Sequence, residues 1–168
     1  MSRLLDAYET VVSPSYRLFG LVDTAVDTYG PDGDNVHWLI SAPGLVYLQV
    51  PSQVINAVVR LESWSTLPPE REAHWFGREE VEVEIPGGDL GIHTIDGGVQ
   101  QVPLILPSPG LYKMRWQWIF NNERGPFTSP VGPSRTLQIP PGREEELDGK
   151  DQYCLVQIWR IAAGVKAG

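Results

Sequence analysis

The sequence predicts an all-β protein, an antiparallel β-sandwich of jelly-roll type with about nine strands and little helix. The run Pro109–Phe120 alternates bulky residues, among them Trp116 and Trp118, with polar ones such as Lys113. This period of two is typical of a strand with one face on a core and the other in water. Fifteen prolines and seventeen glycines interrupt the chain, and short apolar runs recur between them at roughly ten-residue spacing, which favours many short strands over helices.

The positions of the prolines and glycines divide the chain into the expected secondary-structure elements. The first segment, Leu4–Val12, is a candidate for one or two helical turns, although it is short and weakly periodic. Strands are expected after it wherever an apolar run lies between turn residues. These strands are Tyr16–Val22, Val36–Ser41, Gly44–Val50, Ile55–Trp64, Glu79–Ile85, Leu90–Ile95, Val102–Leu106, Leu111–Phe120 and Tyr153–Ile161.

Charge patterns suggest which strands are neighbours. In Glu79–Ile85 the glutamates alternate with valine and isoleucine, and in Leu111–Phe120 basic residues alternate with aromatic ones. We therefore expect Glu82 and Glu84 to lie opposite Lys113 and Arg115 on an outer sheet face. Each such pair of opposite charges on neighbouring strands contributes about 0.2–1 kcal/mol.

Residues 1–168 are predicted to form a single β-sandwich domain with a long Pro/Gly-rich loop near residues 121–150. A second long connection, Ser65–Gly77, contains two adjacent prolines. Two interpretations of the 121–150 loop are open. It is either an ordered wrap over a sheet edge, held by Phe127, Leu137 and Ile139, or a mobile binding loop.

The composition limits the classes of partner. Thirteen basic and twenty-one acidic residues give a formal charge of −8. This charge disfavours nucleic acid and anionic membranes, because both are bound through basic surfaces. It is compatible with a basic protein partner, since opposite fields speed encounter. The single cysteine excludes an intrachain disulfide, and no signal-peptide or membrane-helix pattern is present, so a cytoplasmic location is expected.

No catalytic, cofactor-binding or metal-binding set is recognisable. His37, His74 and His93 lack zinc-ligand spacing, and Cys154 alternates with apolar residues, as a buried thiol does. The stretch Asp32–Asn35 resembles the start of a calcium loop, but the glycine and glutamate needed further along are missing, which favours a polar turn. The sequence therefore predicts a protein without cofactor or metal that is not an enzyme.

Two features are candidates for partner binding. Trp75, in the segment AHWFG, is the best candidate for an exposed aromatic residue, although plugging an end of the sandwich is the more ordinary role. The end of the long loop is acidic, which matches a basic partner but is also typical of a solvated run. Its candidate residues are Glu144, Glu145, Glu146, Asp148 and Asp151.

Several strand and turn patterns match a known family. They are Ser15–Phe19; Glu79–Ile85 followed by Leu90–His93; Leu104–Pro107 leading into Gly110–Trp116; and Leu147–Tyr153 with Val156–Trp159. Together these patterns resemble the competence protein J-like family of small bacterial β-sandwich proteins, relatives of a nuclease inhibitor. The resemblance covers most of the chain and bears mainly on fold. It implies binding to a nuclease and inhibition of it, and assigns that role to no particular residue.

The function that these observations favour is a non-enzymatic acidic binding protein, an inhibitor or immunity factor for a basic protein such as a nuclease or toxin. An alternative is a structural or accessory subunit of a larger assembly, because long Pro/Gly loops and many aromatic residues suit interfaces. A further alternative is a carbohydrate-binding module, which would need a row of exposed aromatic side chains. The sequence leaves the oligomeric state open.

Overall fold

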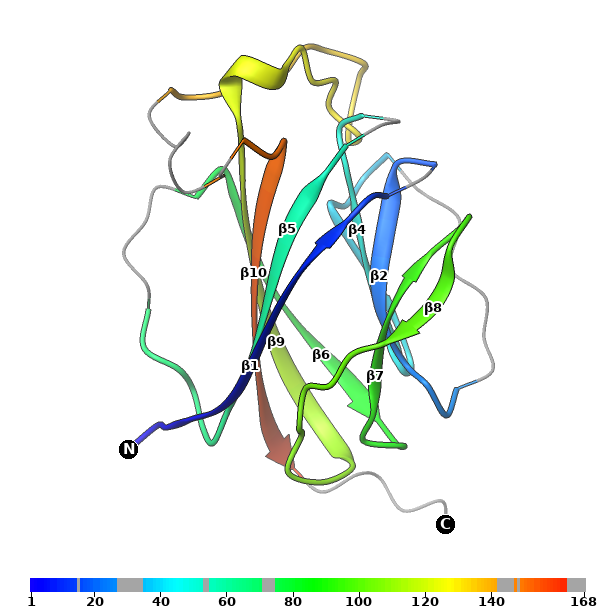
Figure 1. Ribbon diagram of the computed structural model, residues 1–168, viewed down its shortest axis with the longest axis vertical. Helices are drawn as coiled ribbons and strands as arrows, with labels where there is room; N and C mark the ends of the chain where they lie inside the picture. Colours follow the sequence, from blue (N-terminus) through cyan, green and yellow to red (C-terminus); the bar gives the residue numbers. More distant parts are fainter. Residues whose placement is uncertain are drawn as a thin grey trace.

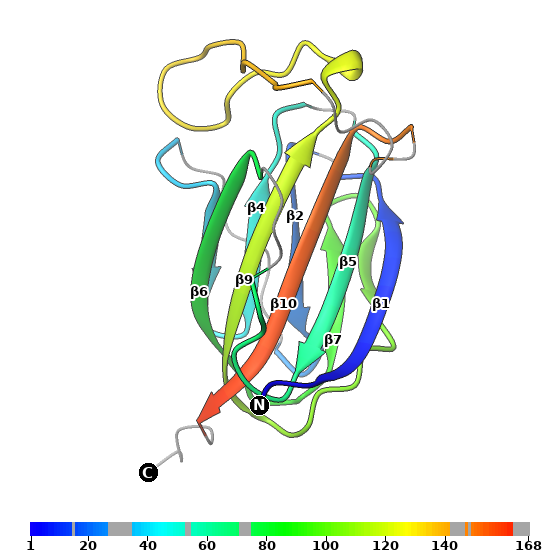
Figure 2. The same cartoon turned by 90° about the vertical axis from the view of Figure 1, so that its left-hand side faces the viewer.

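The computed structural model describes residues 1–14, 16–26, 35–52, 55–70, 75–141, 147 and 149–162. Two five-stranded sheets pack face to face (Figures 1 and 2). Sheet A has the order β1 (Leu4–Val12), β5 (Ala57–Trp64), β10 (Gln152–Ala162), β9 (Gly110–Phe120) and β6 (Gly77–Ile85). Sheet B has the order β3 (Leu39–Ala42), β4 (Leu45–Gln49), β2 (Leu18–Asp23), β7 (Leu90–Thr94) and β8 (Gly98–Gln101).

The predicted all-β sandwich is therefore confirmed. Neighbouring strands are antiparallel, with the exception of β5 and β10, which run parallel in the middle of sheet A. A short 3-10 turn, η1 (Asn122–Arg124), follows β9. No helix of the described residues is long and apolar enough to span a membrane.

Two element predictions are wrong. Leu4–Val12 is strand β1 and not a helical stretch, because its second half points Tyr8 and Val12 into the sandwich while Val11 points out, and the strand pairs with β5. Val102–Leu106 has alternating burial but is not a strand. The N–H of Val102 donates to the Leu90 carbonyl at 3.1 Å, and the ladder ends there because Pro103 lacks the N–H that it needs. The strand at this place is Gly98–Gln101, just before it.

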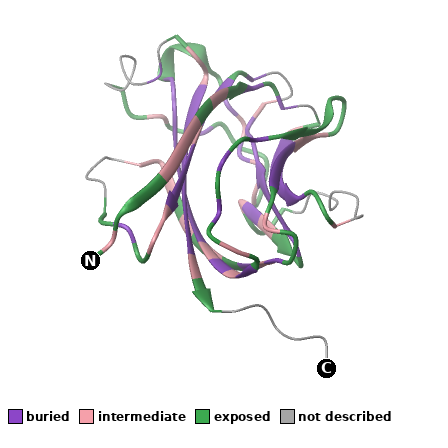
Figure 3. Cartoon of the chain, turned by 60° about the horizontal axis from the view of Figure 1, so that its bottom comes forward, coloured by how far each residue is buried: buried purple, intermediate pink, exposed green. Residues whose placement is uncertain are grey.

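The core lies between the sheets and is built from inward-facing residues of all the strands except β8, which is exposed throughout. Figure 3 shows the buried stretches of these strands in purple. Trp116 and Trp118 of β9 are 0% and 1% exposed, as their alternation predicted. Trp118 packs against Gly77 of β6, where a Cβ atom would come within 2.3 Å of the indole ring. Glycine is thus required at this position to let the tryptophan pack.

The long loop contributes to the core through its described residues. It lies beyond the end of β9, at the top of Figure 1. Phe127 and Leu137 are buried in the main core cluster, Ile139 packs against it, and Thr128 and Thr136 form an isolated β-bridge. For residues 121–141, these contacts favour the ordered wrap over the mobile loop.

Cys154 is buried between the sheets, and burial raises the pKa of its thiol far above the ordinary value, opposed by a hydrogen bond from the Gln152 side chain. We expect no reaction with a chromogenic disulfide reagent in the native state, because the thiolate is the reactive species. In denaturant the thiol should react at once, with Cys154→Ser as the blank. Rapid labelling of the native protein would contradict the buried position.

Candidate functional site: the outer face of sheet A

The outer face of sheet A contains polar side chains that are shielded from water. The alternation in β9 predicted that Lys113, Arg115 and Gln117 would meet solvent. Lys113 is partly exposed, but Arg115 and Gln117 are each only 2% exposed. The reason is the connection after β5, which crosses this face of the sheet (Figure 2) and brings the carbonyl of Pro68 within 3.5 Å of Arg115 Nη1. The prediction of a solvated face is wrong at these two residues.

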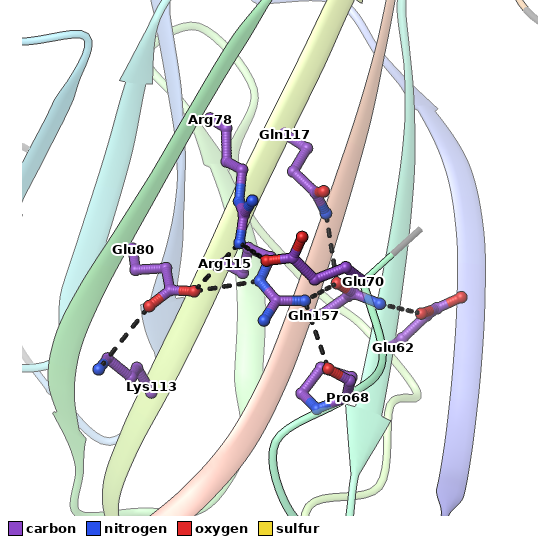
Figure 4. Close-up of polar contacts among 9 residues, drawn as sticks. All are labelled: Glu62, Pro68, Glu70, Arg78, Glu80, Lys113, Arg115, Gln117 and Gln157. Carbon is purple, nitrogen blue, oxygen red and sulfur yellow. Dashed lines mark hydrogen bonds and ion pairs between the residues drawn. The ribbon is translucent and has the colours of Figure 1, made fainter. Parts of the chain in front are cut away.

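Arg115 is the centre of the polar cluster (Figure 4). Its Nε donates to Glu80 Oε1 at 3.1 Å, and its Nη1 donates to Gln157 Oε1 at 3.1 Å. Its guanidinium also lies over the Trp159 ring, 5.5 Å from the ring centroid. The buried cation is therefore paired with a carboxylate, bonded to neutral oxygens and stacked on an aromatic face, which is what its removal from water requires.

The cluster continues across β10 to β5 through two amides and a carboxylate. Gln157 Oε1 also accepts from Gln117 Nε2 at 3.2 Å, and Gln157 Nε2 donates to Glu62 Oε1 at 3.2 Å. Glu62 further accepts from Trp64 Nε1 at 3.0 Å and from Arg60 Nε at 2.8 Å. The hydrogen bond to Glu62 raises the pKa of Arg60 above its ordinary value. The polar chain thus connects four of the five strands of sheet A.

At β6 the cluster reaches the surface. Glu80 lies 3.7 Å from both Lys113 Nζ and Arg78 Nη2, in addition to its bond with Arg115. Arg78 also bonds Glu70 Oε1 at 2.5 Å, and that hydrogen bond lowers the pKa of the Glu70 carboxyl. Glu70 belongs to the crossing connection, so this ion pair and the Pro68 contact fasten the connection at two points.

The predicted charge pairing names the correct neighbouring strands, but some of the residue pairs are wrong. β6 and β9 are neighbours, and Glu82 lies opposite Lys113 as predicted. Arg115 lies opposite Glu80, however, and Glu84 lies opposite Leu111. Sequence alternation identified the correct face of each strand, but the register depends on the whole ladder.

An open cavity of about 540 Å³ adjoins the cluster above β1, β5 and β10. Glu9, Arg60 and Glu62 contribute charged groups to it, Trp64 and Tyr153 contribute aromatic rings, and Glu70 comes from the crossing connection. Because carboxylates outnumber the one arginine, the lining suits cationic or hydrogen-bonding groups of a partner. Among the residues that the structure describes, no group of three His, Cys, Asp or Glu side chains could hold a metal ion.

The partner-binding candidates are distributed unevenly. Trp75 is half-buried and stacks on Tyr153, with ring centroids 6.1 Å apart and planes 16° from parallel. It covers a small apolar cluster on the outer face of sheet A that contains Ile119, Leu147 and Leu155. The structure thus places it over a sheet face and not at an end of the sandwich.

Asp151 joins the segment before β10 to the segment before β5. Its Oδ2 accepts from the backbone N–H of Asn56 at 2.6 Å, and its own N–H donates to the Asn56 carbonyl at 2.9 Å. The other four acidic candidates, Glu144, Glu145, Glu146 and Asp148, lie outside the described residues.

The tryptophans that a carbohydrate-binding module would need are engaged with neighbours. Trp38 contacts Phe76, Trp118 and Phe120 at one end of the core, and Trp64 donates to Glu62. With Trp75 stacked on Tyr153, these three half-buried rings form no exposed row. This argues against the carbohydrate-binding alternative.

Sequence reasoning missed the buried amides Gln117 and Gln157. Gln157 sits between apolar neighbours in the pattern Leu-Val-Gln-Ile-Trp, and Gln117 lies between two tryptophans. Their placement among bulky residues was the available signal for burial. Nothing in the local pattern indicated which distant segment would cover them.

Comparison with known proteins gives a fold relationship. No family model and no curated protein matches the chain. Among solved structures, ComJ from Bacillus subtilis, an inhibitor of the DNA-degrading activity of NucA, superposes with a TM-score of 0.60 at 14% identity, covering 96% of this chain and 99% of ComJ. The product of crocagin biosynthetic gene J gives a TM-score of 0.54 at 18% identity, covering 94% of this chain and 98% of that one. At such identities the similarity shows a shared fold.

Proposed function

We propose that this chain is a non-enzymatic binding protein that inhibits a basic protein, with a DNA-degrading nuclease as the partner class. The observation that carries the proposal is the end-to-end similarity in fold to ComJ, which leaves neither protein with a large unmatched part. The formal charge of −8 is consistent with a basic partner, because complementary fields accelerate association.

The test uses the purified chain as bait in an extract of its native host. The expected result is recovery of a basic nuclease whose digestion of DNA stops when the chain is added in equimolar amount. Inhibition should weaken as salt is raised, because screening slows electrostatically steered association. Failure of excess chain to slow digestion, or the absence of any basic protein among those recovered, would contradict the proposal.

A second candidate function is an accessory subunit of a biosynthetic assembly. It is favoured by the similarity to the product of crocagin biosynthetic gene J, which also spans nearly the whole chain. The same extract distinguishes the two functions. An accessory subunit would be recovered with an enzyme that remains active in the complex, whereas an inhibitor would be recovered with an enzyme that it silences.

A further inference from the structure

Strand β1 forms an edge of sheet A, and its described pairing is with β5 alone. An edge strand leaves one row of backbone N–H and C=O groups available to another strand. The N–H of Ala7 donates to the side chain of the preceding residue, Asp6, at 2.9 Å, so this N–H points away from β5. Because backbone groups two residues apart face the same side of a strand, the N–H groups of Glu9 and Val11 also point to the free side.

The described residues close the beginning of this edge and leave its second half open. Asp6 Oδ2 accepts from the N–H of Ile105 at 2.8 Å, which places the connection after β8 against the start of β1. The open stretch is therefore Ala7–Val12, and Val11 there has a side chain that is 50% exposed.

A groove of about 250 Å³ lies between this open stretch and the strands of sheet B. Tyr8 and Thr10 line it from β1, Thr94 from β7, and Gln100 and Gln101 from β8. None of the described residues that line it carries a charge. An added strand would therefore send one parity of its side chains into an uncharged space that offers hydroxyl and amide groups.

The other sheet edges suit pairing less well. The free side of β6 lies beside β3 of the other sheet, where the Glu79 carboxylate already accepts a hydrogen bond from the Leu39 backbone. The two edges of sheet B, β3 and β8, are only four residues long each. β1 thus combines length, an open backbone and an adjoining groove.

Charge identifies the occupant. Glu9 is the one charged residue within Ala7–Val12, and it is exposed on the outer face, at the rim of the cavity that contains Glu62 and Glu70. Arg60 lies opposite Glu9 on β5, but the three carboxylates of that cavity outnumber it, so a lysine or arginine on an added strand would meet net negative charge there. A second copy of the chain would bring another charge of −8 and another Glu9, which repel.

We propose that the open edge Ala7–Val12 of β1 receives an extended segment of a basic partner, which adds a sixth strand to sheet A. The added strand places lysine or arginine next to Glu9 on the outer face and small or β-branched uncharged residues in the groove. The basic character of the segment rests on the proposed function, whereas the position of the edge and the groove does not.

The experiment uses a synthetic peptide in which lysine alternates with valine and threonine, titrated into the isotope-labelled chain. The expected result is chemical-shift change and slowed hydrogen exchange at the amides of Glu9 and Val11, with further shifts at Thr10 and Gln100. A peptide with glutamate in place of lysine should bind much more weakly. Equal effects of both peptides, shifts confined to β3 or β6, or no shift at saturating peptide would overturn the proposal.

Two variants sharpen the test. Glu9→Lys reverses the charge and should weaken binding of the lysine peptide up to about fivefold, the range of a cross-strand charge pair. Val11→Pro removes a donor from the free edge and should abolish binding; its fold is checked by the unchanged amide spectrum of β9 and β10. Concentration-dependent dimers with protected β1 amides would identify a second copy as the occupant and overturn the proposal.

Failure of this inference and failure of the proposed function are distinguishable. If the unaltered chain inhibits no nuclease but the lysine peptide still protects Glu9 and Val11, only the proposed function fails. If the chain inhibits its nuclease while Glu9→Lys and Val11→Pro inhibit equally well, only the β1 edge is wrong.

Discussion

Replacement of Trp116 by alanine is expected to lower the free energy of unfolding by about 3–5 kcal/mol, the range for removing a large aromatic side chain from a core. The indole is 0% exposed and contacts Phe19 of the opposite sheet, with ring centroids 6.1 Å apart. Its loss leaves a cavity between the sheets that neither layer can close, because each is fixed by its own ladder. Urea denaturation followed by tyrosine fluorescence or circular dichroism measures the effect.

Trp116→Phe is the matched control. The indole Nε1 of Trp116 is buried and has no hydrogen-bond partner among the described residues, so phenylalanine removes an unpaired donor as well as part of the ring. These two effects oppose each other, and we expect a loss of roughly 1–2 kcal/mol at most. An alanine variant as stable as the phenylalanine variant would show that the ring does not bridge the two sheets.

The second large effect is expected at Arg115. Replacement by alanine should cost about 3 kcal/mol, near the lower end of the range for breaking a buried ion pair. The variant leaves Gln157 Oε1 without its charged donor and Glu80 without its closest cation, and it releases the crossing connection from its contact at Pro68. Because Glu80 is partly exposed, water recovers some of the loss.

Arg78→Ala provides the comparison for Arg115. Arg78 joins the same Glu80 and the same connection, but 40% of its side chain is exposed. Surface ion pairs contribute about 0–1 kcal/mol, so the free energy of unfolding of this variant should be close to that of the unaltered protein. Equal destabilisation by the two variants would mean that the buried position of Arg115 adds nothing to its contribution to the free energy of unfolding.

The alternation of side chains correctly predicted the strands whose buried and exposed faces are evident from their own residues. Glu79–Ile85 and Leu111–Phe120 are strands with the expected inward residues, since a period of two is a local property. The weak periodicity of Leu4–Val12 did not identify it as a strand, because its strand pairing with β5 depends on residues some fifty positions away.

The burial of side chains in the candidate site could not be predicted from the alternation of residues along a strand. Whether Arg115 meets water or is covered depends on the path of the connection after β5, and nothing next to Arg115 in the sequence records that path. Trp75, the candidate for an exposed aromatic residue, is half-buried, because it stacks on Tyr153 from a segment far away in the chain. Side-chain burial on the outer face of a sheet is a tertiary property.

The central place of β10 has a consequence for biosynthesis. β10 lies between β5 and β9, so sheet A consists of two separate halves, β1–β5 and β9–β6, until residues 152–162 have left the ribosome. Until β10 is synthesised, the facing edges of β5 and β9 therefore have no strand between them. Because such edges attract other strands, the pairing of β10 with β5 and β9 is the step that removes both of them.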